Sequence, residues 1–146
     1  MASTLHIHIG HFKTGTTALQ VYMARHRAEL IRAGLDYPEP MMRLAKHSVF
    51  ALSVLHAGGV RSLTFGYGRT PTAQTPPEEM YDALYEAVRR SPADHAVISS
   101  EEFMRLGCHP GAMDVMAKML ARRGDLAVKA IAYLRPPGGQ LEAWYA

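Results

Sequence analysis

The sequence predicts a three-layer α/β fold with a parallel central sheet, and three observations support this prediction. Short apolar runs that resemble buried strands alternate with longer segments whose apolar residues have helical spacing. A glycine-containing turn joins the first of these strands to the first helix. The chain has 146 residues, 48% of them hydrophobic and 20% charged, which suits one domain with a sizeable core. Strands joined through helices pair in parallel, and helices then cover both faces of the sheet.

Each element is predicted from its spacing and its end signals. Short apolar runs predict strands over residues 3–9, 95–99 and 126–134. Helical spacing predicts helices over residues 16–33, 42–57, 78–90, 110–123 and 138–146. Residues 35–40 are expected to be extended, and residues 58–77, rich in glycine and proline, to form a loop. Thr75-Pro-Pro-Glu78 predicts a capping box at the start of the third helix.

The most informative segment is the turn from Gly10 to Thr17, with the sequence Gly-His-Phe-Lys-Thr-Gly-Thr-Thr. The backbone N–H groups of such a turn and the positive end of the helix dipole point at one spot, which favours a bound anion. In the nucleotide-hydrolase loop G-x-x-x-x-G-K-[ST], a lysine follows the second glycine. Here Thr16 stands at that position and the lysine lies earlier, at Lys13. This shift predicts a donor with a shorter anionic chain than ATP.

Three segments resemble the family of sulfotransferases that use 3′-phosphoadenosine 5′-phosphosulfate (PAPS), in its bacterial and heparan N-sulfating branches. Residues 7–20, Ile-His-Ile-Gly-His-Phe-Lys-Thr-Gly-Thr-Thr-Ala-Leu-Gln, resemble the loop that binds the 5′-phosphosulfate. Residues 130–145 resemble the segment that binds the 3′-phosphate, with Arg135 in place and Ala143 where the family has a serine. Val97-Ile-Ser-Ser-Glu-Glu102 resembles a strand end of bacterial members. The resemblance implies the P-loop NTPase-like sulfotransferase fold, with residues 1–146 as a single nucleotide-binding domain that corresponds to the N-terminal portion of the family's longer domain, either as a fragment or as a reduced relative.

The resemblance also implies which residues bind the donor. The donor is PAPS, the product is 3′,5′-ADP, and no metal is required. The expected ligands of the 5′-phosphosulfate are the residues of the turn: Gly10, His11, Phe12, Lys13, Thr14, Gly15, Thr16 and Thr17. Ser99 or Ser100 adds a contact, and Arg135 forms a bidentate pair with the 3′-phosphate. Lys13 is expected to be catalytic, because a cation beside the bridging oxygen stabilises the charge that builds there as the bond to sulfur breaks.

The acceptor must lose a proton, so a general base is expected near the sulfur atom. Three side chains are candidates. His47 lies in the segment after the extended stretch, where the family often places its base; Glu101 follows the predicted strand at 95–99; His11 lies inside the turn. We favour His47 slightly over Glu101.

Composition limits the partners and the location. The net charge of +3, without a dense Lys/Arg tract, suits an anionic ligand and argues against nucleic acid. The single cysteine, Cys108, excludes an internal disulfide and indicates the cytoplasm. The apolar run over residues 5–9 is too short to span a membrane. The expected partner is a small-molecule or glycan acceptor, and the sequence leaves sugars, lipids, peptides and small phenols open.

Two other functions and one other site fit parts of the sequence. A P-loop kinase-like phosphotransferase would bind ATP with Mg²⁺, but the lysine after the second glycine is missing. A non-catalytic nucleotide- or anion-binding module fits the short chain and Ala143. His6-x-His8, with His11 close by, has the spacing of a metal pair on one strand face, yet no cluster of Asp and His supplies further ligands. No metal site is therefore predicted.

Overall fold

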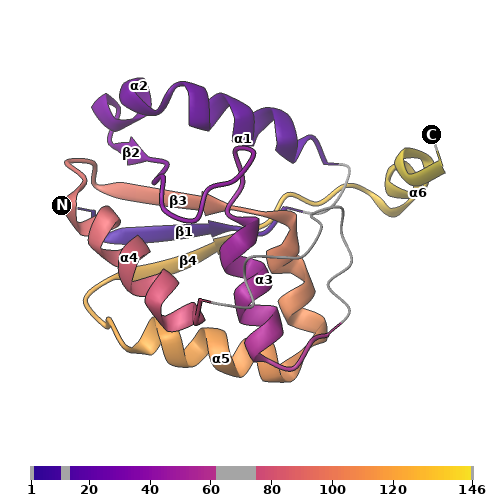
Figure 1. The fold of residues 1–146 in the computed structure, drawn as a ribbon. Coiled ribbons are helices and arrows are strands. Elements are labelled where there is room, and N and C mark those ends of the chain that lie inside the picture. Colours follow the sequence, from indigo (N-terminus) through magenta and orange to yellow (C-terminus); the bar gives the residue numbers. More distant parts are fainter. Residues whose placement is uncertain (1, 11–13, 62–74, 146) are drawn as a thin grey trace.

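The computed structural model describes residues 2–10, 14–61 and 75–145. In this part of the chain the strands form a four-stranded parallel sheet in the order β2-β3-β1-β4 (Figure 1). The strands are β1 (Thr4–His8), β2 (Leu35–Asp36), β3 (His95–Ser99) and β4 (Ala127–Ile131). β1 pairs with β3 on one side and with β4 on the other. The segment that follows β1 therefore leaves the sheet from its interior, between the carboxyl ends of two neighbouring strands.

Helices lie on both faces of this sheet. They are α1 (Thr16–Arg25), α2 (Arg27–Arg32), α3 (Ser48–Ala57), α4 (Pro77–Arg90), the 3₁₀ helix η2 (Glu101–Cys108), α5 (Pro110–Ala121) and α6 (Pro137–Tyr145). Figure 1 shows α3, α4 and α5 together on one side of the strands, and α1 and α2 on the other. α1 and β3 meet on the other face, where Met23 packs near Val97. The predicted mixed α/β class with a parallel sheet is confirmed.

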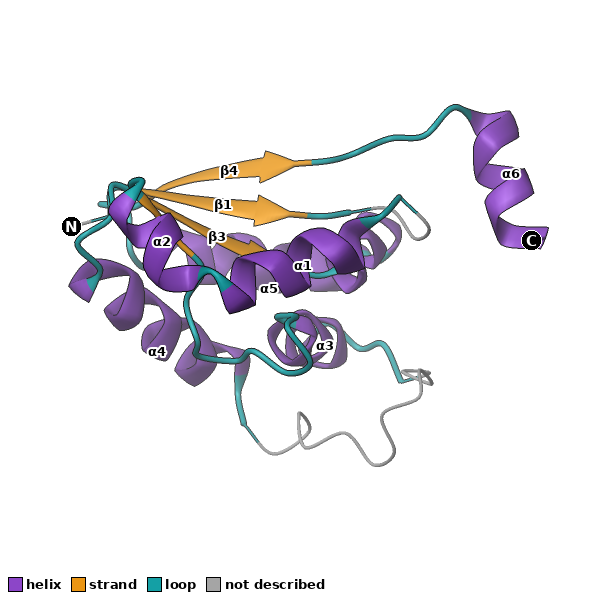
Figure 2. Cartoon of the chain, turned by 90° about the horizontal axis from the view of Figure 1, so that it is seen from above, coloured by secondary structure: helices purple, strands orange, loops and turns teal. Residues whose placement is uncertain are grey.

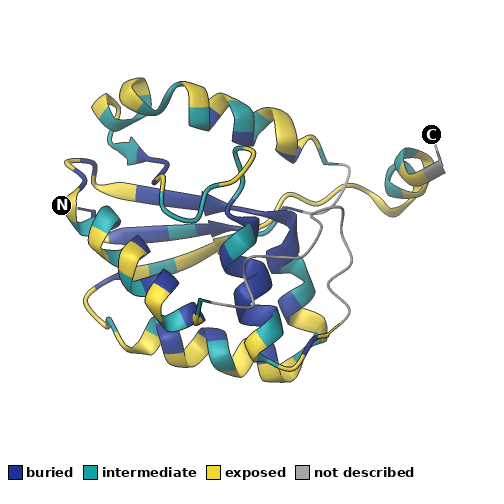
Figure 3. Ribbon diagram, in the orientation of Figure 1, coloured by how far each residue is buried: buried dark blue, intermediate teal, exposed yellow. Residues whose placement is uncertain are grey.

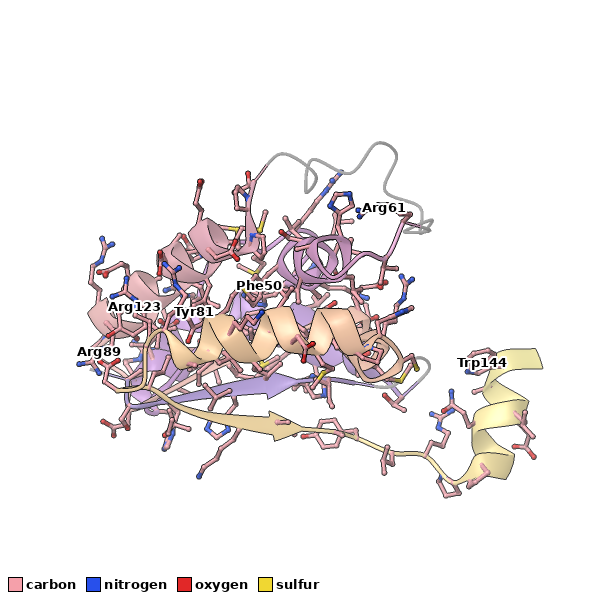
Figure 4. All side chains as sticks on the ribbon, turned by 90° about the horizontal axis from the view of Figure 1, so that it is seen from below. Phe50, Arg61, Tyr81, Arg89, Arg123 and Trp144 are labelled. Atoms are coloured by element: carbon pink, nitrogen blue, oxygen red, sulfur yellow. The ribbon has the colours of Figure 1, made fainter. Side chains whose placement is uncertain are left out.

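The larger hydrophobic core fills the space between the sheet and the helices α3, α4 and α5. Its centre is aromatic. Phe50 and Tyr81 (Figure 4) have ring centroids 6.3 Å apart, and the ring of Phe103 lies 6.1 Å from that of Phe50. α3 is buried along most of its length (Figure 3), because it lies under neighbouring helices as well as against the sheet. Burial of these large apolar side chains supplies the main stabilisation of this layer.

A tight turn precedes α3 and explains why this helix begins at Ser48 and not at residue 42 as predicted. Arg43 and Lys46 exchange two backbone hydrogen bonds, of 2.7 and 3.0 Å. Between them, Leu44 and Ala45 have φ angles of +50° and +64°. Positive φ at both central residues is the signature of a type I′ turn and is unfavourable for residues that carry a side chain. The turn ends at Lys46 and delivers its side chain to the end of β3.

The structure corrects other predicted boundaries as well. The helix predicted over residues 16–33 is interrupted at His26, whose φ of −107° lies outside the helical range, so that α1 and α2 are separate. Thr75 does not cap α4, because Pro76 is the N-cap and Pro77 is the first helical residue. η2 was not predicted. The Ser100 hydroxyl oxygen accepts a hydrogen bond of 3.1 Å from the N–H of Glu102 and so caps this helix.

β4 and α6 are the least covered elements. Ala127, Lys129 and Ala130 are exposed, and the strand predicted over residues 126–134 ends at Ile131. α6 extends away from the rest of the molecule (Figures 1 and 2), and Trp144, on this helix, is 60% exposed (Figure 4). Among the helices of the described residues, none has the length and the apolar character needed to cross a membrane.

Candidate functional site at the carboxyl ends of the central strands

The turn after β1 approaches the first residue of α1 closely. Gly10 lies against Thr16, and a Cβ atom at position 10 would collide with the Cγ2 atom of Thr16 and lie 3.2 Å from Cε1 of His8. Gly15 is the N-cap of α1, with a φ of +78° that glycine adopts without strain. The two glycines are thus required for different reasons, the first by close approach and the second by backbone conformation.

The amino end of α1 is suited to an anion. Gly15 has no side chain that could cap the helix, and the first turn, which begins with Thr16 and Thr17, has no acidic residue. The N–H groups of a first helical turn have no partner within the helix, and together with the helix dipole they present partial positive charge at the end of the sheet. Thr17 is exposed, Thr14 is half-buried and Thr16 is buried.

A buried carboxylate lies beside this helix end. Glu101, which follows β3, is 6% exposed and accepts a hydrogen bond from the Thr16 hydroxyl. The Lys46 ammonium lies 3.2 Å from both of its carboxylate oxygens. Burial raises the pKa of Glu101, but the Thr16 hydrogen bond and the charge of Lys46 outweigh burial and hold the pKa below its usual value. Glu101 is therefore ionised at neutral pH and paired with a cation.

A second set of polar side chains continues from this carboxylate into the sheet. The Gln20 Nε2 group donates to the Ser99 hydroxyl oxygen at 2.9 Å and lies 3.4 Å from Oε2 of Glu101. The Ser99 hydroxyl is also hydrogen-bonded to Nδ1 of His8, at 2.7 Å. The other ring nitrogen of His8, Nε2, is buried and has no hydrogen-bond partner in the described part of the chain. Burial lowers the pKa of His8, so its ring is neutral at pH 7.

His47 is fully buried, and both of its ring nitrogens form hydrogen bonds to backbone groups. Nε2 donates to the carbonyl oxygen of Pro38 at 2.8 Å, and Nδ1 accepts from the N–H of Ser99 at 3.2 Å. A carbonyl only accepts and an amide N–H only donates, so these two bonds fix the tautomer. Burial lowers the pKa of His47 to about 4. To take up a proton, His47 would have to give up its bond to Ser99, and Glu101 would have to give up part of its contact with Thr16 and Lys46.

The predicted site residues are brought together in part. Gly10, Thr16, Ser99 and Glu101 gather at the carboxyl ends of β1 and β3. Arg135 lies on the exposed stretch between β4 and α6, and its side chain packs against Gly139. His11, Phe12 and Lys13 lie outside the described residues. Their roles, and that of Arg135, stay predictions.

Sequence reasoning missed three members of this network: Lys46, Gln20 and His8. Gln20 gave a usable signal, because it is a polar residue on the helix face that also carries Thr16 and Met23, all of them buried. His8 was considered only as half of a metal pair. His6, the other half, faces His95 with 3.4 Å between ring nitrogens. Within residues 2–10, 14–61 and 75–145, no three His, Cys, Asp or Glu side chains are grouped as a metal site.

Comparisons of the chain with family models, with curated proteins and with solved structures found no match.

Proposed function

We propose that this protein binds PAPS at the turn from Gly10 to Thr17 and transfers its sulfuryl group to a hydroxyl or amine acceptor. The observation that carries the proposal is the amino end of α1, whose first turn has no acidic residue. It follows β1, an interior strand of the parallel sheet, and lies beside the buried Glu101. Ligands of such sheets bind beyond the carboxyl ends of the strands. The sequence of the turn, with its lysine at position 13, favours a phosphosulfate over a triphosphate.

The residues divide the chemistry between them. The N–H groups of residues 14–17 and the Thr17 hydroxyl hold the 5′-phosphate. The Thr16 hydroxyl does not donate to it, because its hydrogen is already donated to Glu101. The acceptor oxygen or nitrogen attacks sulfur, and the bond between sulfur and the bridging oxygen breaks. Its electron pair stays on that oxygen, where Lys13 stabilises the charge, and 3′,5′-ADP leaves. The acceptor proton goes to a base, for which His47 and Glu101 are the candidates. Arg135 binds the 3′-phosphate.

A P-loop kinase-like phosphotransferase is the second candidate, and one observation favours it. Nucleotide hydrolases hold Mg²⁺ with the Ser/Thr at the end of the loop and with a carboxylate; here Thr17 stands at that loop position, and the buried Glu101 lies beside the start of the same helix. Against it, the Lys46 ammonium already neutralises Glu101.

Calorimetry distinguishes the candidates. We expect 3′,5′-ADP to bind without metal, and ATP with Mg²⁺ to bind at least tenfold more weakly; the reverse preference would refute the sulfotransferase. Binding of 3′,5′-ADP without sulfuryl transfer to any acceptor would identify a non-catalytic module. Lys13→Ala should lower the transfer rate far more than the affinity for 3′,5′-ADP, and Lys118→Ala, an exposed lysine on α5, is the matched control. An unchanged rate in Lys13→Ala would remove Lys13 from the catalytic step.

The exposed, free thiol of Cys108 suits a reducing compartment, and we propose the cytoplasm as the location.

A further inference from the structure

Two histidines meet on the face of the sheet that α1 covers. His6 is on β1, and His95 is the first residue of β3. Because His95 is opposite Thr4, two residues before His6, the two histidines are diagonal neighbours on one face of the strands. Val97, opposite His6, packs near Met23 of α1, which identifies the face. Nε2 of His6 lies 3.4 Å from Nδ1 of His95.

The geometry of this pair fits a shared metal ion better than a hydrogen bond. Hydrogen bonds from N–H groups in proteins are about 2.7–3.2 Å long between heavy atoms. Two imidazoles bound to one tetrahedral Zn²⁺ through bonds of about 2.0–2.1 Å have their nitrogens about 3.3–3.4 Å apart and their ring centroids about 5.2 Å apart. The rings of His6 and His95 show 3.4 Å and 5.3 Å. A straight N–H···N bond of that length would separate the centroids by about 5.7 Å, so at least one ring is tilted off the line between the nitrogens.

The surroundings of the pair leave space for the other ligands of a metal ion. Both histidines line a groove with a volume of about 520 Å³ between α1 and the sheet, and His95 is exposed. In the part of the chain that the structure describes, no third His, Cys, Asp or Glu joins them. Water would complete the coordination, as it does at open zinc sites. Imidazole suits Zn²⁺, Cu²⁺ and Ni²⁺, whereas Mg²⁺ and Ca²⁺ prefer oxygen ligands, so the pair selects transition metals.

Lys129 opposes a cation at this place. It is opposite His6 in the pairing of β1 with β4. Burial, His95 and the charge of Lys129, in that order, lower the pKa of His6. The charge of Lys129 repels a metal ion in the same way, so it lowers the affinity of the pair and gives the site a residue whose removal should strengthen binding.

We propose that His6 and His95 bind a divalent transition metal ion of the Zn²⁺ class, which joins β1 to β3. The sequence indicated a metal pair of His6 with His8, but the Ser99 hydroxyl holds Nδ1 of His8, and the structure pairs His6 with His95 instead. The two ligands are 89 residues apart in the chain and meet only in the folded sheet. The ion therefore binds the folded protein in preference to the unfolded chain and stabilises it. This site does not depend on the proposed sulfuryl transfer.

The test titrates ZnCl₂ into the full chain, prepared without a polyhistidine tag, and follows the imidazole nitrogens by NMR. We expect saturable shifts of Nε2 of His6 and Nδ1 of His95, and a melting temperature that rises with the Zn²⁺ concentration. MgCl₂ should produce neither effect. His6→Gln and His95→Gln should each weaken Zn²⁺ binding at least tenfold, because one imidazole alone forms no chelate. Lys129→Gln should strengthen it about threefold.

The matched control is His26→Gln. It removes a histidine that pairs with Glu29 outside the groove, and it should leave the affinity unchanged. The proposal is overturned if Zn²⁺ shifts other histidines but not both His6 and His95, if either His6→Gln or His95→Gln keeps full affinity, or if MgCl₂ gives the same shifts. The NMR titration uses the unmodified protein, so it decides the question even where a variant fails to fold. Its result is the same whether or not the protein binds 3′,5′-ADP, so the two proposals succeed or fail separately.

Discussion

Substitution of Lys46 by methionine probes the charge balance at the end of β3. Lys46→Met keeps most of the stem of the side chain and removes the ammonium that lies 3.2 Å from both oxygens of Glu101. Loss of one partner of a buried ion pair costs about 3–5 kcal/mol. Here the Lys46 side chain is 21% exposed and Glu101 retains its hydrogen bond from Thr16, so the cost is smaller. We expect the free energy of unfolding to fall by about 1–3 kcal/mol at pH 7.

The same substitution should lose much of its effect in acid. The folded-state pKa of Glu101 is below its usual value, so its contribution to stability is present at neutral pH and is lost as the pH falls through that lowered value. Without Lys46, the pKa of Glu101 rises in the folded protein. The variant then takes up a proton at a higher pH than the unmodified protein does. The difference in stability between the two should therefore shrink below about pH 4, under the usual pKa of a glutamate.

Urea unfolding at pH 7 and pH 4 measures both effects. A loss of about 2 kcal/mol lowers the midpoint by about 1 M for a chain of this size. Lys118→Met, at an exposed position on α5, is the matched control and should be neutral at either pH. A loss of stability that is equal at pH 7 and pH 4 would refute the ion-pair explanation, and so would an unchanged midpoint at pH 7.

Three further predictions concern the backbone and His47. Gly10→Ala should cost about 1–3 kcal/mol through the clash with Thr16, whereas Gly107→Ala meets no atom within 4 Å and should be nearly neutral; equal melting temperatures would contradict the close approach. Leu44→Gly should stabilise the protein by up to about 1 kcal/mol, because glycine tolerates the positive φ; a lower melting temperature would contradict the strain argument. The pKa of His47 is about 4 in the folded protein and about 6.5 in the unfolded chain. The free energy of unfolding should therefore fall by about 3 kcal/mol as the pH is lowered from 6.5 to 4. His47→Gln should lack that decline in urea titrations, and an unaltered pH dependence would show that His47 is not its source.

The parts of the fold that follow hydrophobic spacing could be predicted from the sequence. β3 was predicted with its observed bounds, because residues 95–99 form a buried apolar run between clear breaks. The turn before α3 could not be predicted. Its central residues, Leu44 and Ala45, are ordinary helix formers, and only tertiary contacts hold them at positive φ. One of those contacts is the hydrogen bond of 2.8 Å from the Tyr37 hydroxyl to the Ala45 carbonyl oxygen.

The candidate site was predictable where it depends on chain order and unpredictable where it depends on side-chain contacts. Gly10 and Ser99 each lie at or just after the end of a predicted strand, and parallel strands place their carboxyl ends at one edge of the sheet. The pairing of Lys46 with Glu101 spans 55 residues and depends on the strained turn, and no local pattern indicates it. His47 was predicted as a candidate base from its place in the chain. The structure shows that both ring nitrogens are hydrogen-bonded to backbone groups, which the sequence alone does not reveal.

The bond between His8 and Ser99 has a consequence for how the sheet is assembled. These two residues are directly opposite each other in the pairing of β1 with β3, so the hydrogen bond between their side chains fixes the register of the two strands. A slip of one residue would turn Ser99 toward the apolar layer and leave the imidazole facing an aliphatic neighbour. One hydrogen bond thus joins the alignment of the two central strands to the candidate site, so a substitution at His8 or Ser99 would affect both.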